Sequence, residues 1–170
     1  MRPMSHKLLA AAITAAACAA AAPAQAADAS FSVRVLTPEA AQKAALAALA
    51  ACRKAGYQVA VAVVDRGGVP QVMLRDRFAG PHTPDVATDK AWTAVSFKTD
   101  TGELAKVTGP GMPQSGLRGV ARVTAFGGGL MIQGAGTLFG GIGVSGAPGG
   151  EADEACAKAG IDAIRDDLEM

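Results

Sequence analysis

Five residues within one stretch of the sequence carry side chains that bind metals, cofactors or anions: His82, Asp85, Asp89, Lys90 and Thr93. A neutral imidazole nitrogen can coordinate haem iron or a transition metal. A lysine ammonium presents a point charge to a carboxylate, a phosphate or a haem propionate, and a threonine hydroxyl adds a hydrogen bond. The segment G-P-H-T-P places His82 on an exposed turn directly before a helix.

The spacing of these residues leaves functional and structural interpretations open. Asp85 and Asp89 follow His82 by three and seven positions, so the three side chains can share one side of the expected helix. A lone histidine also suits an ordinary surface position, and an acid in a first helical turn favours the helix dipole. Likewise, Lys90 suits a solvated helix position, and a helix threonine such as Thr93 often bonds to its own backbone.

Familiar catalytic and nucleotide-binding motifs do not occur in the sequence. The glycine run FGGIGVSG (139–146) is not followed directly by the helix that a dinucleotide site needs, and there is no phosphate-binding G-x-x-x-x-G-K-[ST]. No serine-histidine-aspartate order, zinc-protease motif or C-x-x-C pair is present. The motifs therefore assign no catalytic residue and leave open whether the protein is an enzyme.

The elements that position these residues are largely segregated into runs of helices and runs of valine-rich strands. Thr37 followed by Pro38 begins a helix, and Thr83 followed by Pro84 repeats the signal. We expect helices at residues 38–55, 84–97, 101–107 and 151–167, and strands at 58–65, 69–75, 120–126, 130–133 and 137–145. This order predicts an α+β domain with an antiparallel sheet of about five strands.

Glycine marks two further features of the expected domain. Residues 108–119 contain four glycines and two prolines and are expected to form a loop, either functional or a simple crossover. Glycines also interrupt the strand at 137–145, which indicates that backbone or ligand approaches it closely.

Length and charge restrict the class of protein. The chain has 170 residues, of which 50% are hydrophobic and 18% charged, which favours one globular domain over a disordered chain. A formal charge of +1 gives no electrostatic footprint for nucleic acid.

The N-terminus predicts export. Arg2 and Lys7 precede an apolar run at residues 8–22, and A-Q-A at 24–26 matches a signal-peptidase site. We expect residues 1–26 to be a cleaved signal peptide, leaving a periplasmic or secreted domain at 27–170 with no stable membrane anchor. An uncleaved anchor and a lipoprotein signal at Cys18 are the alternatives, but the run is shorter than a bilayer span.

Signal cleavage changes the inventory of reactive residues. It leaves 14 basic and 15 acidic residues, a net charge of −1, and makes His82 the only histidine. It also leaves Cys52 and Cys156 as the only cysteines. An exported chain can form a disulfide, but two small buried side chains are an equal alternative.

Four segments carry a family resemblance: VAVAVVDRGGVPQVMLRD (59–76), VATDKAWTAVSF (86–97), GGGLMI (127–132) and GGIGVSGAPGGEADEACAKAGIDAI (140–164). The K-A-x-T-A pattern in the second and the G-x-x-G-V-S-G pattern in the fourth are specific in combination. On these segments the chain resembles the GlcG/HbpS-like family, a haem-binding or haem-degrading domain. With the first helix, they cover nearly the whole mature chain.

The resemblance implies a profilin-like α+β fold, with a five-stranded antiparallel sheet and helices on both faces, and assembly into homo-oligomers. It implies an exported haem-binding protein in which His82 approaches the iron and Lys90 neutralises a propionate. Haem sequestration, sensing and oxidative haem breakdown all stay open as its role. The alternative is an enzyme or binder for a small anionic metabolite, held between helix 84–97 and strand 137–145.

Overall fold

The computed structural model describes residues 29–169, and the compact unit within it begins at Val33. The signal peptide expected at residues 1–26 lies outside the described residues. Among the helices in the described part of the chain, none combines the length and the apolar character that a membrane span requires.

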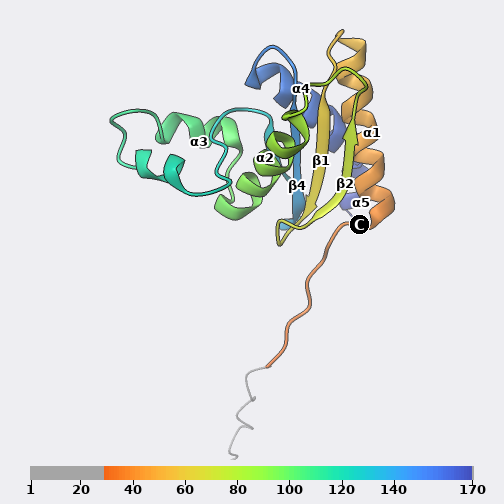
Figure 1. Ribbon diagram of the computed structural model, residues 1–170. Helices are drawn as coiled ribbons and strands as arrows, with labels where there is room; N and C mark the ends of the chain where they lie inside the picture. The colour runs from red at the N-terminus through yellow and green to blue at the C-terminus, as the bar shows by residue number, and fades with distance from the viewer. Residues whose placement is uncertain (1–28, 170) are drawn as a thin grey trace, which may run out of the picture. The chain divides into compact units, whose positions relative to one another are not determined.

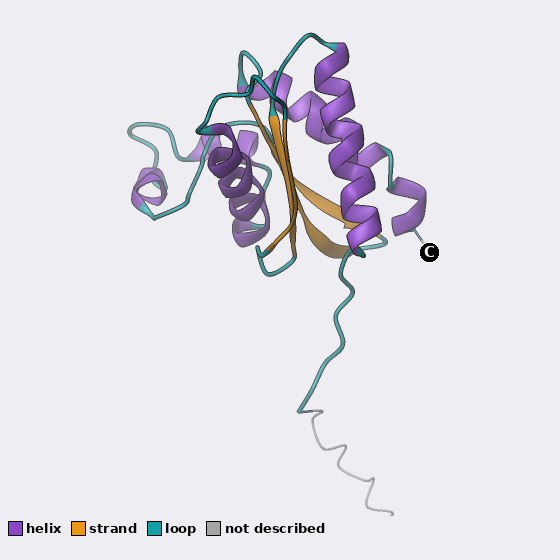
Figure 2. Cartoon of the chain, turned by 45° about the vertical axis from the view of Figure 1, so that its right-hand side comes forward, coloured by secondary structure: helices purple, strands orange, loops and turns teal. Residues whose placement is uncertain are grey.

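The unit is an α+β fold with helices on both faces of an antiparallel sheet, which confirms this part of the expected fold (Figures 1 and 2). Its strands are β1 (Ala60–Asp65), β2 (Pro70–Arg75), β3 (Gly129–Gly134) and β4 (Thr137–Ser145), in the spatial order β2-β1-β4-β3. Its helices are α1 (Pro38–Lys54), α2 (Thr83–Phe97), α3 (Thr101–Val107), α4 (Gly150–Asp162) and α5 (Arg165–Leu168), with a 3₁₀ turn at Ser115–Gly119.

Strand β1 lies at the centre of the sheet and is buried on both faces. Val61 and Val63 belong to the main core, which α1 and α4 cover. On the other face, the small side chains of Ala60 and Ala62 pack against Ala87 of α2. Figure 2 shows the two layers of helices on opposite sides of the strands. This arrangement explains why the sequence of β1 is almost continuously apolar.

Glycines in β4 allow α2 to pack directly on the sheet. A Cβ atom added to Gly143 would lie 1.9 Å from the carbonyl oxygen of Ala87, and one added to Gly141 would lie 2.8 Å from that of Ala91. The expected close approach to this glycine-rich strand is therefore made by the backbone of α2. The two surfaces expected to line the alternative small-anion pocket contact each other here instead.

Replacing Gly143 with alanine should consequently destabilise the fold, because α2 must move away from β4 to accept the methyl group. We expect a loss of about 1–3 kcal/mol, the usual range for overpacking a core. Urea unfolding of Gly143→Ala beside Gly116→Ala measures it, since Gly116 has nothing within 4 Å of an added Cβ. Equal stability of the two variants would contradict the close contact.

The prediction of a fifth strand at residues 120–126 is wrong, because the sheet has four strands. Arg122 adopts a left-handed backbone conformation with φ 70°, which interrupts an extended chain. The outer edge of β3 is also already occupied by side chains. Met131 N donates to Asp100 Oδ1 at 2.9 Å, and Gly129 N donates to Thr101 Oγ1 at 2.9 Å. The start of α3 therefore takes the place of a neighbouring strand.

The C-terminal helix is shorter than the expected 151–167, because α4 ends at Asp162 and α5 begins at Arg165. Ile164 leaves the helical conformation with φ −115° and ψ 7°, and its side chain is completely buried. A disulfide joins Cys52 of α1 to Cys156 of α4, with their Cα atoms 5.4 Å apart. The structure thus answers the question that the sequence left open for these cysteines.

Candidate functional site

His82 occupies the turn between β2 and α2 and is exposed, at the N-cap position of α2. Its side chain does not cap the helix. Thr83 closes the turn instead, because its hydroxyl donates to the carbonyl oxygen of Gly80 at 2.7 Å. The imidazole makes no hydrogen bond to any residue in the described part of the chain. Both ring nitrogens are therefore available to a ligand.

Gly80 controls where the imidazole lies. A Cβ atom at Gly80 would lie 2.7 Å from His82 Cε1 and 3.0 Å from Nδ1. The imidazole therefore rests with this edge against the glycine, and Nε2 is the nitrogen farther from it. Glycine at position 80 allows a flat ring to pack directly on the backbone of the turn.

A cleft of about 640 Å³ opens beside His82. Its wall is formed by residues 56–58 after α1, by the turn before α2, and by the loop from Ser145 to Gly150. Three aromatic side chains line it: Tyr57, which is partly buried, Phe78, which is 79% exposed, and Phe126, which is 50% exposed. Exposed aromatic rings beside an unbonded imidazole suit a flat, largely apolar ligand.

Lys90 does not reach this cleft as an exposed cation, and the expectation of a solvated lysine is wrong. Its side chain is completely buried. The ammonium donates to Asp153 Oδ2 at 2.7 Å and to the carbonyl oxygen of Val144 at 2.9 Å. It also lies 4.6 Å from the centre of the Phe126 ring. Lys90 is thus enclosed behind Asp153 and Phe126, which both line the His82 cleft.

Burial dominates the electrostatics of this ion pair. It lowers the pKa of Lys90, and the neighbouring Asp153 carboxylate only partly offsets that effect. It raises the pKa of Asp153, against the opposing hydrogen bond from Lys90. Asp153 Oδ1 accepts a further hydrogen bond from Ala147 N at 2.9 Å. The pair therefore fixes the loop from Ser145 to Gly150, which forms one wall of the cleft.

Thr93 holds the segment that leads to Phe126. Its hydroxyl accepts a hydrogen bond from Thr124 N at 3.0 Å and lies 3.3 Å from the carbonyl oxygen of Arg122. The threonine therefore bonds across to another segment rather than back to its own helix. Because its side chain is buried, it positions the chain near the cleft rather than lining it.

The two aspartates of α2 do not line the His82 cleft. Asp85 is exposed on the first turn. Asp89 accepts a hydrogen bond from Arg122 Nε at 2.9 Å, and that guanidinium stacks on the Trp92 ring at 4.8 Å. No group of three or more His, Cys, Asp or Glu side chains is arranged to hold a metal ion anywhere in the described residues.

Sequence reasoning missed Phe78, Phe126 and Asp153 as residues of the site. Asp153 lies in the first turn of α4, where an acid is common, so its position in the sequence does not reveal its buried partner Lys90. One signal was available, because a lysine that becomes buried needs a carboxylate partner. No sequence pattern could identify the two phenylalanines, since the fold brings them together from distant segments.

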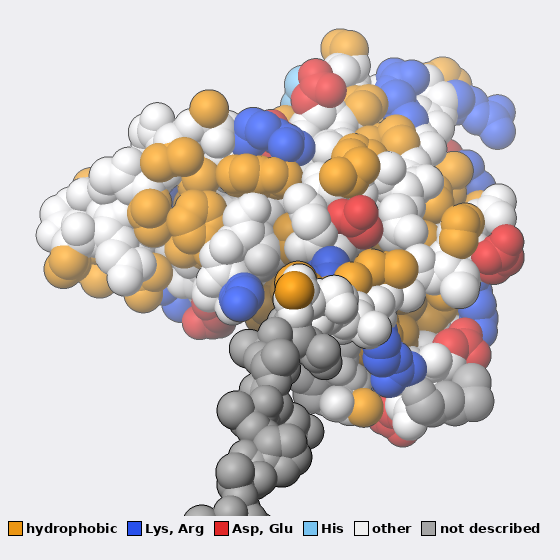
Figure 3. Space-filling model, turned by 90° about the horizontal axis from the view of Figure 1, so that it is seen from below, with side chains coloured by type: hydrophobic (Ala, Val, Ile, Leu, Met, Phe, Trp, Pro, Cys, Tyr) orange, Lys and Arg blue, Asp and Glu red, His pale blue; other side chains and the backbone are white. Residues whose placement is uncertain are grey.

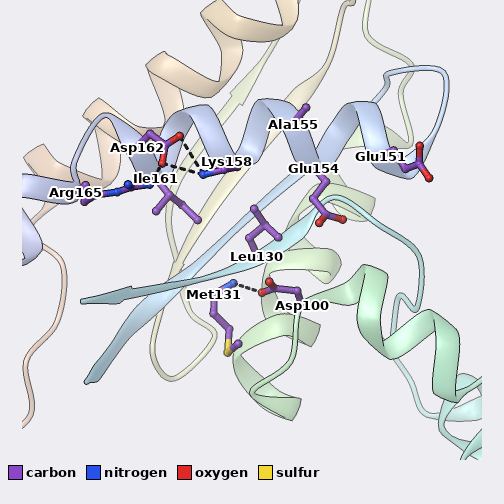
Figure 4. Close-up of a pocket in the computed structure, with 10 residues that line it drawn as sticks. All are labelled: Asp100, Leu130, Met131, Glu151, Glu154, Ala155, Lys158, Ile161, Asp162 and Arg165. Carbon is purple, nitrogen blue, oxygen red and sulfur yellow. Dashed lines mark hydrogen bonds and ion pairs between the residues drawn. The ribbon is translucent and has the colours of Figure 1, made fainter. Parts of the chain in front are cut away.

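A second groove of about 460 Å³ runs between β3 and α4 (Figure 4). Leu130, Met131 and Ile161 form its apolar part. Its two cations, Lys158 and Arg165, both pair with Asp162. Burial raises the pKa of two of its other acids, Asp100 and Glu154. Since this groove offers neither an imidazole nor an exposed aromatic ring, the His82 cleft is the candidate site.

Comparisons with known proteins agree with this fold. The family model described as "Haem degrading protein HbpS-like" matches residues 36–162. A curated relative, the corrinoid adenosyltransferase PduO of Salmonella typhimurium, is 41% identical over 90 residues, which make up 52% of this chain. This chain spans 27% of the length of that relative.

Two solved structures resemble the whole compact unit. A double mutant of Streptomyces reticuli HbpS is 43% identical, with a TM-score of 0.75, and the match covers 85% of this chain and 98% of that one. A complex of PduOC with haem is 35% identical, with a TM-score of 0.73, and the match covers 76% and 95% of the two chains.

Proposed function

Because the chain belongs to the HbpS-like family of haem-degrading proteins, we propose that it binds haem in the His82 cleft. The observation that carries this proposal is an exposed imidazole without a hydrogen-bond partner in the described chain, beside a cleft lined by Phe78 and Phe126. A related structure, the PduOC complex, contains haem. The residues present in the cleft therefore fit the ligand that the family suggests.

Each residue of the cleft has a distinct role in this proposal. His82 coordinates the iron through Nε2, and Gly80 sets the position of its ring. Phe78 and Phe126 contact the apolar macrocycle, because flat aromatic surfaces pack well on one another. The bound iron supplies the redox chemistry of any haem breakdown, while the protein controls position and access. Sequestration, sensing and breakdown are the roles that this binding can serve.

We also propose that the protein is exported and oligomeric. The charged, apolar and A-Q-A segments of residues 1–26 support a cleaved signal peptide, and the buried Cys52–Cys156 disulfide supports an oxidising compartment. Exposed hydrophobic side chains at Val107, Met112 and Val120 support a subunit interface. Figure 3 shows hydrophobic side chains on the part of the molecule formed by α3 and the loop after it, which extends away from the sheet in Figure 1.

Titration with ferric haem tests the proposed function. We expect saturable one-to-one binding with a Soret band, accompanied by quenching of Trp92, the chain's one tryptophan. His82→Ala should shift the Soret band and weaken binding by at least about tenfold, which is about 1.4 kcal/mol. Asp85→Ala is the matched control, because Asp85 is exposed nearby but does not line the cleft.

The outcomes separate the ligand from its coordination. An unchanged Soret band and affinity in His82→Ala would leave haem as a ligand and remove His82 as its iron donor. Weak binding to the wild-type protein that does not saturate would contradict haem as the ligand.

A further inference from the structure

Lys90 has one more hydrogen-bond donor than the structure gives it oxygen acceptors. A protonated lysine carries three N–H groups. Two are accepted by Asp153 Oδ2 and the carbonyl oxygen of Val144. The ammonium also lies against the face of Phe126, whose ring centre is 4.6 Å away, and close to the backbone of Gly128. A completely buried cation thus has one direction in which an aromatic ring replaces an oxygen.

Phe126 is a partly exposed side chain that lines two clefts. It is 50% exposed and lines the His82 cleft on one side and a second cleft, next to α3, on the other. The backbone after it packs closely on the ion pair, because a Cβ atom at Gly128 would lie 2.7 Å from Lys90 Nζ and 2.7 Å from Asp153 Cβ. The Phe126 side chain therefore lies between the ammonium and the two clefts that it lines.

The charges around Phe126 indicate the side from which an anion would enter. The cleft next to α3 is lined by Glu103, Glu151 and Glu154, with Lys106 as its single cation. These carboxylates repel an anion. The described lining of the His82 cleft contains one acid, Asp153, whose two oxygens are already bonded. An anionic group of a ligand in the His82 cleft thus meets less repulsion.

We propose that Lys90 is a buried carboxylate-binding residue of the His82 cleft, and that a ligand carboxylate reaches it by displacing the Phe126 side chain. The third N–H of the ammonium then donates to a carboxylate oxygen, while the bonds to Asp153 and Val144 remain. A charge-assisted hydrogen bond in a dry environment is stronger than contact with the face of a phenylalanine. Under the proposed function, on which this inference rests, the carboxylate is a haem propionate.

Haem and haem dimethyl ester, in which both propionates are blocked, separate this contact from binding in general. We would titrate both ligands into the wild-type protein, Lys90→Met/Asp153→Asn, and Lys106→Met. The double substitution removes both buried charges and keeps an acceptor for Ala147 N. Lys106→Met is the matched control, because it removes an exposed ammonium that pairs with Glu103.

We expect haem to bind about tenfold more tightly than its ester in the wild-type protein and in Lys106→Met, and about equally in the double variant. Phe126→Ala should increase the ratio of the affinity for haem to the affinity for its ester, because no aromatic ring then has to be displaced before a carboxylate reaches Lys90. An unchanged preference in the double variant would overturn the role of Lys90 while leaving haem binding intact. A smaller ratio of haem affinity to ester affinity in Phe126→Ala than in the wild-type protein would overturn the proposal that the carboxylate displaces the Phe126 side chain.

If neither porphyrin binds, the proposed function fails, and sodium propionate tests Lys90 separately. The ¹⁵N signal of the Lys90 ammonium reports the contact directly, because buried ammonium protons exchange slowly. A saturable shift of this signal in the wild-type protein, together with movement of the Phe126 ring signals, would support the carboxylate site. Signals that do not change at high propionate concentration would overturn it.

Discussion

Asp153→Ala is expected to destabilise the protein by about 3–5 kcal/mol at neutral pH, because it leaves the Lys90 charge buried without its partner. Lys90 is completely buried, and its ammonium lies 2.7 Å from Asp153 Oδ2. The substitution also removes the acceptor of Ala147 N. Urea unfolding at equilibrium measures the loss.

The pH dependence of this loss identifies its cause. In the wild-type protein, burial already lowers the pKa of Lys90, and Asp153 partly restores it. Without Asp153, the pKa of Lys90 in the folded state falls further below the ordinary value of 10.5. The folded protein then releases this proton more readily than the unfolded chain, so stability rises with pH in that window. The difference in the free energy of unfolding between the wild-type protein and Asp153→Ala should therefore be smaller at about pH 9 than at pH 7.

Lys90→Met/Asp153→Asn is the control for this interpretation. Because it removes both charges together, it should recover at least half of the stability lost in Asp153→Ala. It should also remove the dependence on alkaline pH that Lys90 causes. A double variant as unstable as Asp153→Ala would show that lost packing, rather than an unpaired charge, explains the effect.

Removing the disulfide is expected to have a comparable effect, through the unfolded chain rather than through a buried charge. Cys52 and Cys156 are separated by 104 positions in the sequence, and a crosslink over about 100 residues contributes about 4–5 kcal/mol by restricting the unfolded state. Cys52→Ala/Cys156→Ala should lose about this much in urea unfolding.

Chemical reduction is the independent check on this prediction. Wild-type protein treated with a reductant should unfold at the same urea concentration as the double alanine variant. The double variant itself should not respond to the reductant. A loss below about 1 kcal/mol would mean that the unfolded chain is not restricted by this crosslink.

Local signals in the sequence were sufficient for most of the elements. The helix starts at Thr37-Pro38 and Thr83-Pro84 correspond to α1 and α2, and the glycine-bearing turn after Asp65 joins β1 to β2. Glycine in β4 correctly indicated a close approach. These features depend on neighbouring residues and on backbone geometry, which a single sequence displays.

Features that depend on distant segments were not predictable in the same way. Residues 120–126 have the composition of a strand, but Thr93 and Asp100 lie on other elements and determine where that segment and the β3 edge find their hydrogen bonds. The helical spacing of Lys90 does not reveal that Asp153 lies 63 positions away in sequence and within 2.7 Å in space. The burial of Lys90 results from the way in which distant segments pack around α2, and the sequence of α2 alone does not show it.

The candidate site likewise combines a locally determined part, which the sequence predicts, with a part that depends on distant segments. The segment around His82 was correctly predicted as an exposed turn before a helix, because proline and glycine determine its local conformation. The walls of the cleft beside His82 are formed by three segments and by Phe126, which come together only in the folded chain. A single sequence could therefore suggest the iron donor but not the walls of the site.

Pulsed electron paramagnetic resonance of ferric haem bound to the protein tests the central claim most directly. The chain from Ala27 onward retains the compact unit that begins at Val33 and contains one histidine, His82. Labelling histidine with ¹⁵N therefore labels a single imidazole. We predict a ¹⁵N coupling to the iron that is absent from unlabelled protein and from His82→Ala. A spectrum with porphyrin nitrogen couplings alone would contradict coordination by His82.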